Sequence, residues 1–485
     1  MLDTERANRR ALTLQEAAIA GLLLLLPVLV LVYRDHMIEL GAWLAALVLI
    51  AASYHWPLPM LTIELFLSTS ALKFIGIKQW PHLIGGLPLD PPDILVLIFF
   101  GLGVAKLIRR HEQPLFLGPL LLFGLMAALS AVLAPLTGTQ SLYDSLNGLR
   151  QLSGYLFYFG VVGAIDTPGR LRSLIRVVFV LLLVTVGIQL AEALRGQQFT
   201  TAIAPFNAYY SGQVTVSAGD LTAPYLWNRA QGYLVVGLFL ALGQWLWARG
   251  PKSLLLVALA ITGYVLQMIR QWYLFIALGS IVSLLLLRRG RLQAFTGLIL
   301  LLAILGLFLS MLTLSGSFAF PVAKLWLARI STLANMQQEP NFVFRLQTWQ
   351  EQLRLFRQAP LFGQGPGSSD RLGQSDPFFT FFDLDTGMSN TLLQYGIFGT
   401  AAIWVLIASF LRQASSLLRA LATSPDRGYV AGLLALWLVM IAGYLTSQDF
   451  FTAVELVFAT GLTLALLDRL HAFARPPRAD RREGL

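Results

Sequence analysis

The sequence predicts an all-α fold, a polytopic bundle of transmembrane helices with one large extracytoplasmic loop. Of its 485 residues, 56% are hydrophobic and 12% are charged. The apolar residues gather in runs of about 20, the length that spans a hydrocarbon core as a helix. These runs are continuous and do not alternate with period two, so helices rather than barrel strands must satisfy the backbone in lipid.

The apolar runs predict about fourteen spans of this length. In chain order they are 12–33, 37–55, 58–77, 92–108, 115–135, 145–164, 172–194, 224–248, 254–269, 272–288, 293–315, 389–411, 428–446 and 450–468. The first is too long for a cleaved signal peptide and lacks an Ala-x-Ala-like site. The third carries Glu64 and Lys73, and its loss alone would invert the topology of every later span.

The net charge of +10 is interpreted first as an orientation signal, because short cytoplasmic loops are rich in Lys and Arg. With a cytoplasmic N-terminus, every basic cluster falls on the cytoplasmic side: Arg6, Arg9, Arg10; Lys106, Arg109, Arg110; Arg170, Arg172, Arg176; Arg249, Lys252; Arg288, Arg289, Arg291; Arg412, Arg419, Arg427; and the tail from Arg469. We therefore expect a multi-pass inner-membrane protein with both termini in the cytoplasm and no nucleic acid partner.

The same topology divides the chain into three parts. Residues 1–315 hold transmembrane helices 1–11, residues 316–388 form the extracytoplasmic loop, and residues 389–485 hold transmembrane helices 12–14 and the basic tail. There is no cysteine, the five histidines are scattered, and no nucleotide-binding glycine motif occurs in the cytoplasmic turns. We expect no metal and no cofactor, and a function that faces away from the cytoplasm.

The loop at 316–388 is far more polar than the rest of the chain and has its own helix. Leu346, Trp349, Leu353 and Phe356 recur at spacings of three and four, which predicts an amphipathic helix on the outer membrane face. Asn341 is its predicted N-cap and Pro360 its stop, followed by the turn Leu-Phe-Gly-Gln-Gly-Pro-Gly at 361–367. The alternative is a helix that only caps the bundle.

Four arginines are predicted near the outer surface, against the positive-inside tendency. They are Arg150, Arg229, Arg270 and Arg345. A charge at mid-membrane costs about 2.5 to 3.5 kcal/mol on insertion scales, so an anionic partner is expected. A guanidinium suits the oxygens of a lipid diphosphate. Snorkelling to headgroups, or an internal ion pair, is the alternative for each arginine alone.

The chain resembles the bacterial O-antigen ligase and polymerase family in three motifs. They are Arg345-x3-Trp349, Ala359-Pro360-Leu361-Phe362-Gly363-x-Gly365-Pro366-Gly367, and Ser389-Asn390-Thr391-Leu392-Leu393-Gln394-Tyr395-Gly396-Ile397-Phe398-Gly399. Arg270 is similar to the arginine of the family's S-R-G position, and Arg229 to an arginine that opens an earlier span. The resemblance covers residues 229–400.

This resemblance implies a GT-C-like, metal-independent glycosyltransferase. Its donor would be a glycan on undecaprenyl diphosphate, and its acceptor either lipid A core, in ligases, or another lipid-linked repeat unit, in polymerases. Membrane lipid, a flippase and a chain-length regulator are further candidate partners. The predicted catalytic residues are Arg229, Arg270, Arg345, Asp385 and Ser389; the predicted diphosphate- and glycan-binding residues are Arg150, Arg229, Arg270, Arg345, Trp349 and Asn390.

One departure from the family pattern favours a polymerase over a ligase. Where the ligases have His-Asn, this chain has Ser389-Asn390, and a serine hydroxyl is a poor general base near neutral pH. Asp385, with Asp383 beside it, is the nearest carboxylate that could act as the base. Asp385 lies four residues before Ser389, on the same face of a helix that begins early. The alternative is that both carboxylates only solvate the loop or pair with Arg371.

A transporter of lipid-linked sugar or of a small anion is the alternative from another class. No convincing repeat relates residues 1–240 to 241–485, whereas many transporters contain such halves. A large loop on one side also favours an enzyme over alternating access. A purely structural role is disfavoured by the charges placed where they cost energy.

Overall fold

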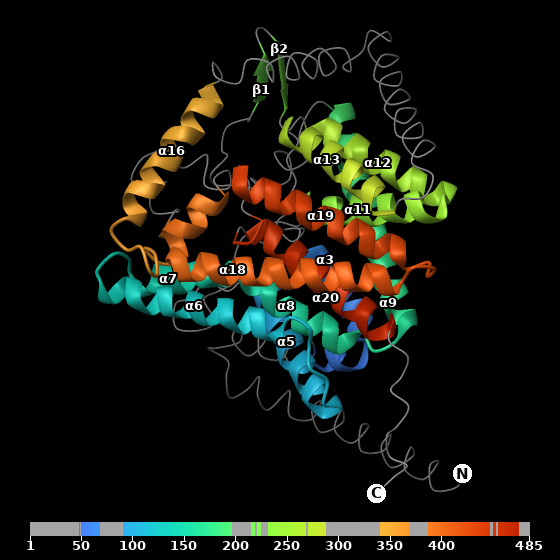
Figure 1. The fold of residues 1–485 in the computed structure, drawn as a ribbon, viewed down its shortest axis with the longest axis horizontal. Coiled ribbons are helices and arrows are strands. Elements are labelled where there is room, and N and C mark those ends of the chain that lie inside the picture. The colour runs from blue at the N-terminus through green and yellow to red at the C-terminus, as the bar shows by residue number, and fades with distance from the viewer. Residues whose placement is uncertain are drawn as a thin grey trace, which may run out of the picture. The chain divides into compact units, whose positions relative to one another are not determined.

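A computed structural model describes residues 48, 50–67, 91–195, 215–218, 221–224, 231–267, 270–287, 340–368, 387–446, 450–452 and 454–474. The chain divides into two units, Met1–Pro57 and Leu58–Leu485, and every contact below lies in the second (Figure 1). Its helices are α3 (Pro57–Leu67), α5 (Pro91–Arg110), α6 (Leu117–Leu136), α7 (Leu142–Arg150), α8 (Ser153–Ala164), α9 (Pro168–Arg195), α11 (Gln231–Ala248), α12 (Pro251–Gln267), α13 (Arg270–Leu287), α16 (Pro340–Phe356), α18 (Gly387–Ala420), α19 (Arg427–Thr446) and α20 (Val454–Ala474).

The described helices confirm the all-α membrane class. Four are long and apolar enough to cross a membrane, namely Leu117–Leu136, Gly387–Ala420, Arg427–Thr446 and Leu456–Ala474, and three shorter apolar helices accompany them. The predicted spans at 12–33, 37–55 and 293–315 lie wholly or mostly outside the described residues, so the total of fourteen stays a prediction. A short antiparallel hairpin, β1 (Thr215–Ala218) with β2 (Leu221–Pro224), was not predicted.

Glycines let the helix backbones of the bundle touch directly. A Cβ on Gly163 of α8 would lie 2.5 Å from the Cα of Gly103 in α5, and a Cβ on Gly154 would lie 2.5 Å from the backbone nitrogen of Phe458 in α20. In lipid there is no hydrophobic force between helices, so close packing at small residues replaces it. These contacts place α8 between α5 and α20 and join the two ends of the described chain.

The predicted sixth span, 145–164, is wrong as a single helix. The structure has two helices, α7 and α8, separated at Gln151 and Leu152. Ser141 begins α7 by accepting a hydrogen bond from the amide of Asp144, a typical N-cap. Arg150 is therefore the last residue of a short separate helix, not a charge inside a span. α7 has 9 residues and α8 has 12, so neither reaches by itself the length of about 20 residues that spans a membrane.

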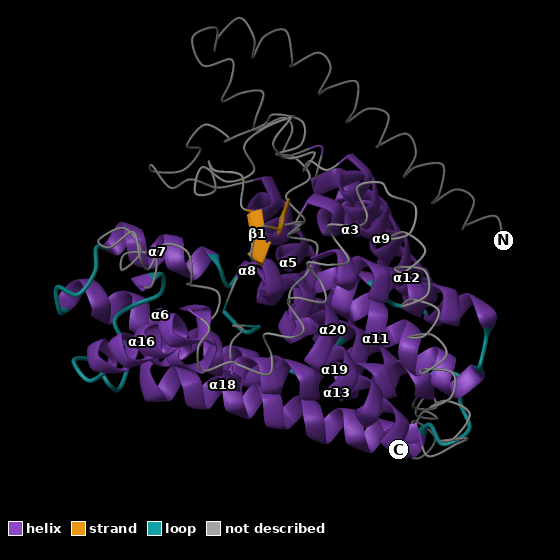
Figure 2. Cartoon of the chain, turned by 90° about the horizontal axis from the view of Figure 1, so that it is seen from above, coloured by secondary structure: helices purple, strands orange, loops and turns teal. Residues whose placement is uncertain are grey.

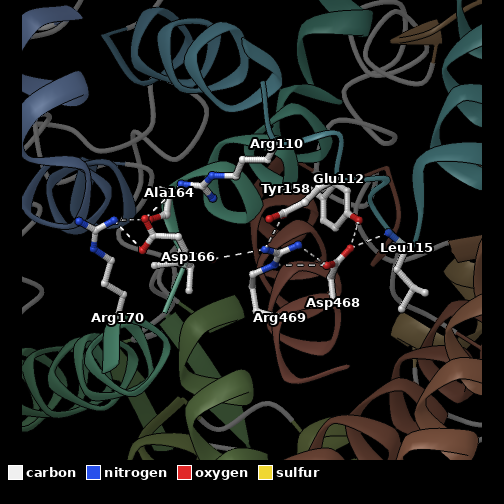
Figure 3. A network of polar contacts seen from close by, with 10 residues as sticks. Arg110, Glu112, Leu115, Tyr158, Ala164, Asp166, Arg170, Asp468 and Arg469 are labelled. Atoms are coloured by element: carbon white, nitrogen blue, oxygen red, sulfur yellow. Dashed lines mark hydrogen bonds and ion pairs between the residues drawn. The ribbon is translucent and has the colours of Figure 1, made fainter. Parts of the chain in front are cut away.

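One end of the bundle carries a network of charged side chains (Figure 3). Arg469 of α20 donates to Glu112, which follows α5, over 3.1 Å, and Asp166 before α9 accepts from Arg110 over 3.1 Å and from Arg170 over 2.7 Å. These bonds gather turns that the charge pattern assigns to a single side. Which side faces the cytoplasm stays a prediction.

The turn between α18 and α19 is joined to the end of α11 by one hydrogen bond and one cation–π contact. Gln244 donates to the carbonyl of Pro425 over 2.9 Å, and the guanidinium carbon of Arg427 lies 5.2 Å from the ring centroid of Trp247. Both turns are on the predicted cytoplasmic side. That these two turns lie together agrees with the charge pattern, now for α11, α18 and α19.

Candidate active site

A glycine-rich turn is inserted into a break in α18. Gly396 has φ 66° and ψ −166°, which is not helical, so the helix is kinked there. In a regular helix the next two amides would donate to carbonyls four residues earlier. Instead, Ile397 donates to the carbonyl of Pro360 over 2.9 Å and Phe398 to that of Leu361 over 3.2 Å. The turn thus replaces two helical hydrogen bonds.

The carbonyls released by the kink are also taken by the turn. Leu393 accepts from the amide of Gln364 over 2.7 Å, and Gln394 accepts from the amide of Gly365 over 3.2 Å. The hydroxyl of Ser130 in α6 adds a third bond, to the Gln394 carbonyl, over 2.7 Å. A broken membrane helix is tolerated only where its free backbone groups find partners. Here the turn and α6 supply them.

Two glycines make this insertion possible. Gly363 has φ 76°, and a Cβ there would lie 2.5 Å from the carbonyl of Gln394. A Cβ on Gly396 would clash with the backbone of Leu361 in the same way. Both positions combine a left-handed backbone with direct contact between chain segments, so only glycine fits. The glycine motif at 361–367 therefore encodes a tightly packed turn.

Gln394 connects this turn to the predicted substrate-binding residue Asn390. Its Nε2 donates to Oδ1 of Asn390 over 3.0 Å, and its Oε1 accepts from the amide of Gly367 over 3.2 Å. From the other side, Nε2 of Gln140 donates to the carbonyl of Pro366 over 2.8 Å. All of these side chains are buried. Neutral amides therefore fix the turn from both sides.

Ser389, the predicted catalytic serine, is held by the loop helix. Its Oγ donates to Oε1 of Gln352 over 2.5 Å. Gln352 and Thr348, one turn apart on α16, are both buried, and α16 packs against α18, as Figure 2 also shows. An amide oxygen can orient a hydroxyl but cannot remove its proton at neutral pH. Gln352 therefore positions Ser389 without activating it.

The apolar side of α16 faces outward. Leu346 is 48% exposed and Trp349 is 37% exposed, while the helix packs on α18 through Thr348 and Gln352. This agrees with an amphipathic helix at the membrane surface. The helix begins at Pro340, so Asn341 lies inside its first turn and the predicted cap is wrong by two positions.

Glu351 and Arg354 form an ion pair on the exposed part of α16. Arg354 donates to Glu351 through Nε over 2.8 Å and through Nη2 over 2.5 Å. This hydrogen bonding lowers the pKa of Glu351, against a small opposing effect of burial. The two residues are three apart, a spacing that stabilises isolated helices.

Arg150, one of the predicted diphosphate-binding arginines, has a carboxylate next to it. Its Nε lies 3.7 Å from Oδ2 of Asp93 at the start of α5. This ion pair ties α7 to the end of α5 opposite the charged network. Arg150 therefore has an internal ion pair, which was the alternative to binding an anionic ligand.

The other predicted site residues fall into two groups. Arg270 is the first residue of α13 and Arg345 lies in α16, but their side chains, together with Arg229 and Asp385, lie outside the described residues. Convergence of the arginines stays a prediction. Ser389 and Asn390 are brought together with three glutamines. Gln140 and Gln352 lie outside the sequence motifs, and Gln394 lies in the third motif but had no predicted role. One signal was available for α16, because Thr348 and Gln352 are spaced by four on the helix face opposite Leu346.

These features define a class, a helical membrane protein in which the glycine turn that follows α16 is inserted into the next long helix, α18. Residues 254–404 match the sequence model of the family described as O-antigen ligase. This match confirms the resemblance to the O-antigen ligase and polymerase family over residues 254–404. It covers α12, α13, α16, the glycine turn and the kink of α18. No curated protein matches the chain.

Proposed function

We propose that the protein polymerises oligosaccharide repeat units carried on undecaprenyl diphosphate into O-antigen or exopolysaccharide at the outer face of the inner membrane. The observation that carries this proposal is Ser389 in place of the family's histidine, with its hydroxyl donating to Gln352. A serine hydroxyl that donates to a neutral amide oxygen is a poor general base, unlike the histidine at this position in the ligases. The match to the family model over residues 254–404 supports the broader class of enzyme.

In the proposed reaction a hydroxyl oxygen of the acceptor repeat unit attacks the anomeric carbon of the donor glycan. The bond between that carbon and the diphosphate oxygen breaks, and undecaprenyl diphosphate leaves with the electron pair. Arg229, Arg270 and Arg345 stabilise the charge that develops on the leaving group. The acceptor proton passes to Asp385. No metal or cofactor takes part in this scheme.

Purified protein in detergent, given lipid-linked repeat units from its own host, tests the proposal by glycan length on a gel. A ladder of multiples is expected from wild type and its loss from Arg270→Ala, since removing one charge-stabilising donor costs about 100- to 1000-fold in rate. Arg412→Ala is the matched control, because Arg412 is exposed on α18 at the predicted cytoplasmic side. A control that loses the ladder equally would contradict the assigned role of Arg270.

The family description, O-antigen ligase, favours a second candidate, transfer of a finished glycan to lipid A core. The same assay with a lipid A core acceptor separates the two reactions. A single transfer to that acceptor without a ladder would identify a ligase despite Ser389. No covalent change with either acceptor would favour a transporter, because a carrier leaves glycan length unchanged.

The base is tested separately. Asp385→Asn is expected to abolish polymer formation at unchanged protein level, with Asp383→Asn as the neighbouring control. Normal polymer from Asp385→Asn would remove Asp385 from the mechanism and leave the proton acceptor to the diphosphate oxygens themselves.

A further inference from the structure

Three buried polar atoms gather on the α6–α7 side of the glycine turn without a hydrogen-bond partner among the described residues. They are Oε1 of Gln140, Oγ of Ser145 and Oγ of Ser368. The three residues are only 6%, 0% and 7% exposed. Buried hydroxyls and amides are normally paired, and an unpaired one lowers stability. An arrangement with three such atoms in one place needs a reason beyond folding.

All three atoms lie at the glycine turn, because Ser368 ends the stretch 365–368 and Gln140 and Ser145 lie on the segments that pack against it. A Cβ on Gly365 would lie 2.6 Å from Oε1 of Gln140. Ser145 lies one turn before Gly148, and these two form the buried side of α7. Gly148 packs directly against the backbone of Gly367. A Cβ on Gly367 would lie 3.2 Å from the Cα of Gly148. Ser368 follows in the chain, so the three side chains line one short stretch.

The chemistry of this cluster is neutral. It offers one amide oxygen, which accepts, and two hydroxyls, which donate and accept. Sugar hydroxyls have the same dual character, and a site built to bond a substrate hydroxyl discriminates strongly against groups that cannot replace it. A phosphate would favour the arginines instead. The cluster therefore matches the glycan rather than the diphosphate.

We propose that Gln140, Ser145 and Ser368 form a sugar-binding subsite for hydroxyl groups of the glycan; this inference rests on the proposed glycosyl transfer. The turn that carries Ser368 is bonded through Gln394 to Asn390. A sugar bound in the subsite is thereby placed beside the Ser389–Asn390 pair. The arginines hold the charged end of the donor, and this subsite holds neutral sugar.

Saturation-transfer NMR on the full-length protein in detergent tests the subsite. The probe is the host's repeat-unit oligosaccharide released from its lipid by mild acid, so neither diphosphate nor turnover is needed. Ser145→Ala and Ser368→Ala should each weaken sugar affinity by about three- to tenfold, the value of one hydrogen bond. Their melting temperatures should stay equal or rise, because an unpaired buried hydroxyl is removed.

Ser283→Ala is the matched control. Ser283 is also fully buried, but its hydroxyl donates to the carbonyl of Gly279 over 2.8 Å in α13. Its sugar affinity should equal that of wild type. Gln140→Ala is less informative alone, because it also loses the bond to Pro366.

Unchanged affinity in both serine variants, or no saturation transfer to the oligosaccharide from wild type, would overturn the subsite. The polymerase proposal fails independently. Weakened binding in the variants without a glycan ladder from wild type would keep the subsite and reject the polymerase. A glycan ladder from wild type with unaltered sugar binding in the variants would keep the polymerase and reject the subsite.

Discussion

The two ends of α5 carry polar networks of opposite kind. At the end near Arg110, Asp468 accepts from the amide of Leu115 over 2.7 Å and from the hydroxyl of Tyr158 over 2.6 Å, and Arg469 completes the group with a 2.9 Å bond to the same carboxylate (Figure 3). At the end near Asp93 there is an ion pair between Arg150 and Asp93. Beyond it, uncharged amides and hydroxyls hold the glycine turn and leave three buried atoms unpartnered among the described residues.

The difference separates a network that stabilises the bundle from one suited to a ligand. A buried charge must be fully paired, because its desolvation costs several kcal/mol, and the Asp468 carboxylate meets this requirement with bonds from α20, α8 and the segment before α6. Neutral groups tolerate incomplete pairing at a smaller cost. We therefore expect mutations at the charged end to change stability, and mutations at the neutral end to change function.

The largest effect on stability is expected from Asp468→Ala. It leaves Arg469 buried with one carboxylate fewer and removes the acceptor of Tyr158 and Leu115, so about 3 to 5 kcal/mol should be lost. Thermal unfolding in detergent measures this. Asp166→Ala at the same end is the control, since its ion pairs are partly exposed and worth less than about 1 kcal/mol. Equal losses would contradict the assignment of Asp468 as the central group.

Gly363→Ala should come next. The left-handed backbone costs an alanine about 1 to 2 kcal/mol, and the clash with the Gln394 carbonyl adds to it, so both melting temperature and polymer yield should fall. Gly138→Ala isolates the first cost, because Gly138 has φ 72° but no atom within 4 Å of the position that a Cβ would take. Equal melting temperatures and equal polymer yields in the two variants would show that the contact between the turn and α18 contributes to neither.

A smaller loss is expected from Gln352→Ala, which removes the acceptor of the Ser389 hydroxyl. Stability should fall by about 0.5 to 1.5 kcal/mol, the net value of one hydrogen bond. Polymer yield should fall further than unfolding alone explains. Gln350→Ala, on the exposed side of the same helix, should match wild type in both measurements. A normal yield from Gln352→Ala would show that Ser389 needs no positioning.

The smallest effect concerns pH. Because Arg354 lowers the pKa of Glu351, the pair stabilises α16 at any pH above the ordinary glutamate value, and this contribution disappears as the pH falls through the lowered pKa. The melting temperature of wild type should exceed that of Glu351→Gln slightly at neutral pH and converge with it in acid. A difference that persists in strong acid would rule out the charge as its origin.

The membrane class, the helices along apolar runs and the position of the site motifs follow from the amino-acid sequence without coordinates. Hydrophobicity over about 20 residues decides whether a helix can enter lipid, and this is a property of each segment alone. The helical spacing of α16 and the glycines at 363, 365 and 396 are visible for the same reason. Ser389 could likewise be compared with the family pattern directly.

The contacts of these residues depend instead on the packed fold. The exchange of hydrogen bonds between the turn and α18 joins residues about thirty positions apart, and no local pattern encodes such a pairing. The break at Gln151, the pairing of Ser389 with Gln352 and the unpartnered atoms beside Ser145 likewise depend on how separate helices meet. Local composition selects the elements, whereas backbone and side-chain groups find their hydrogen-bond partners only when those elements are packed together.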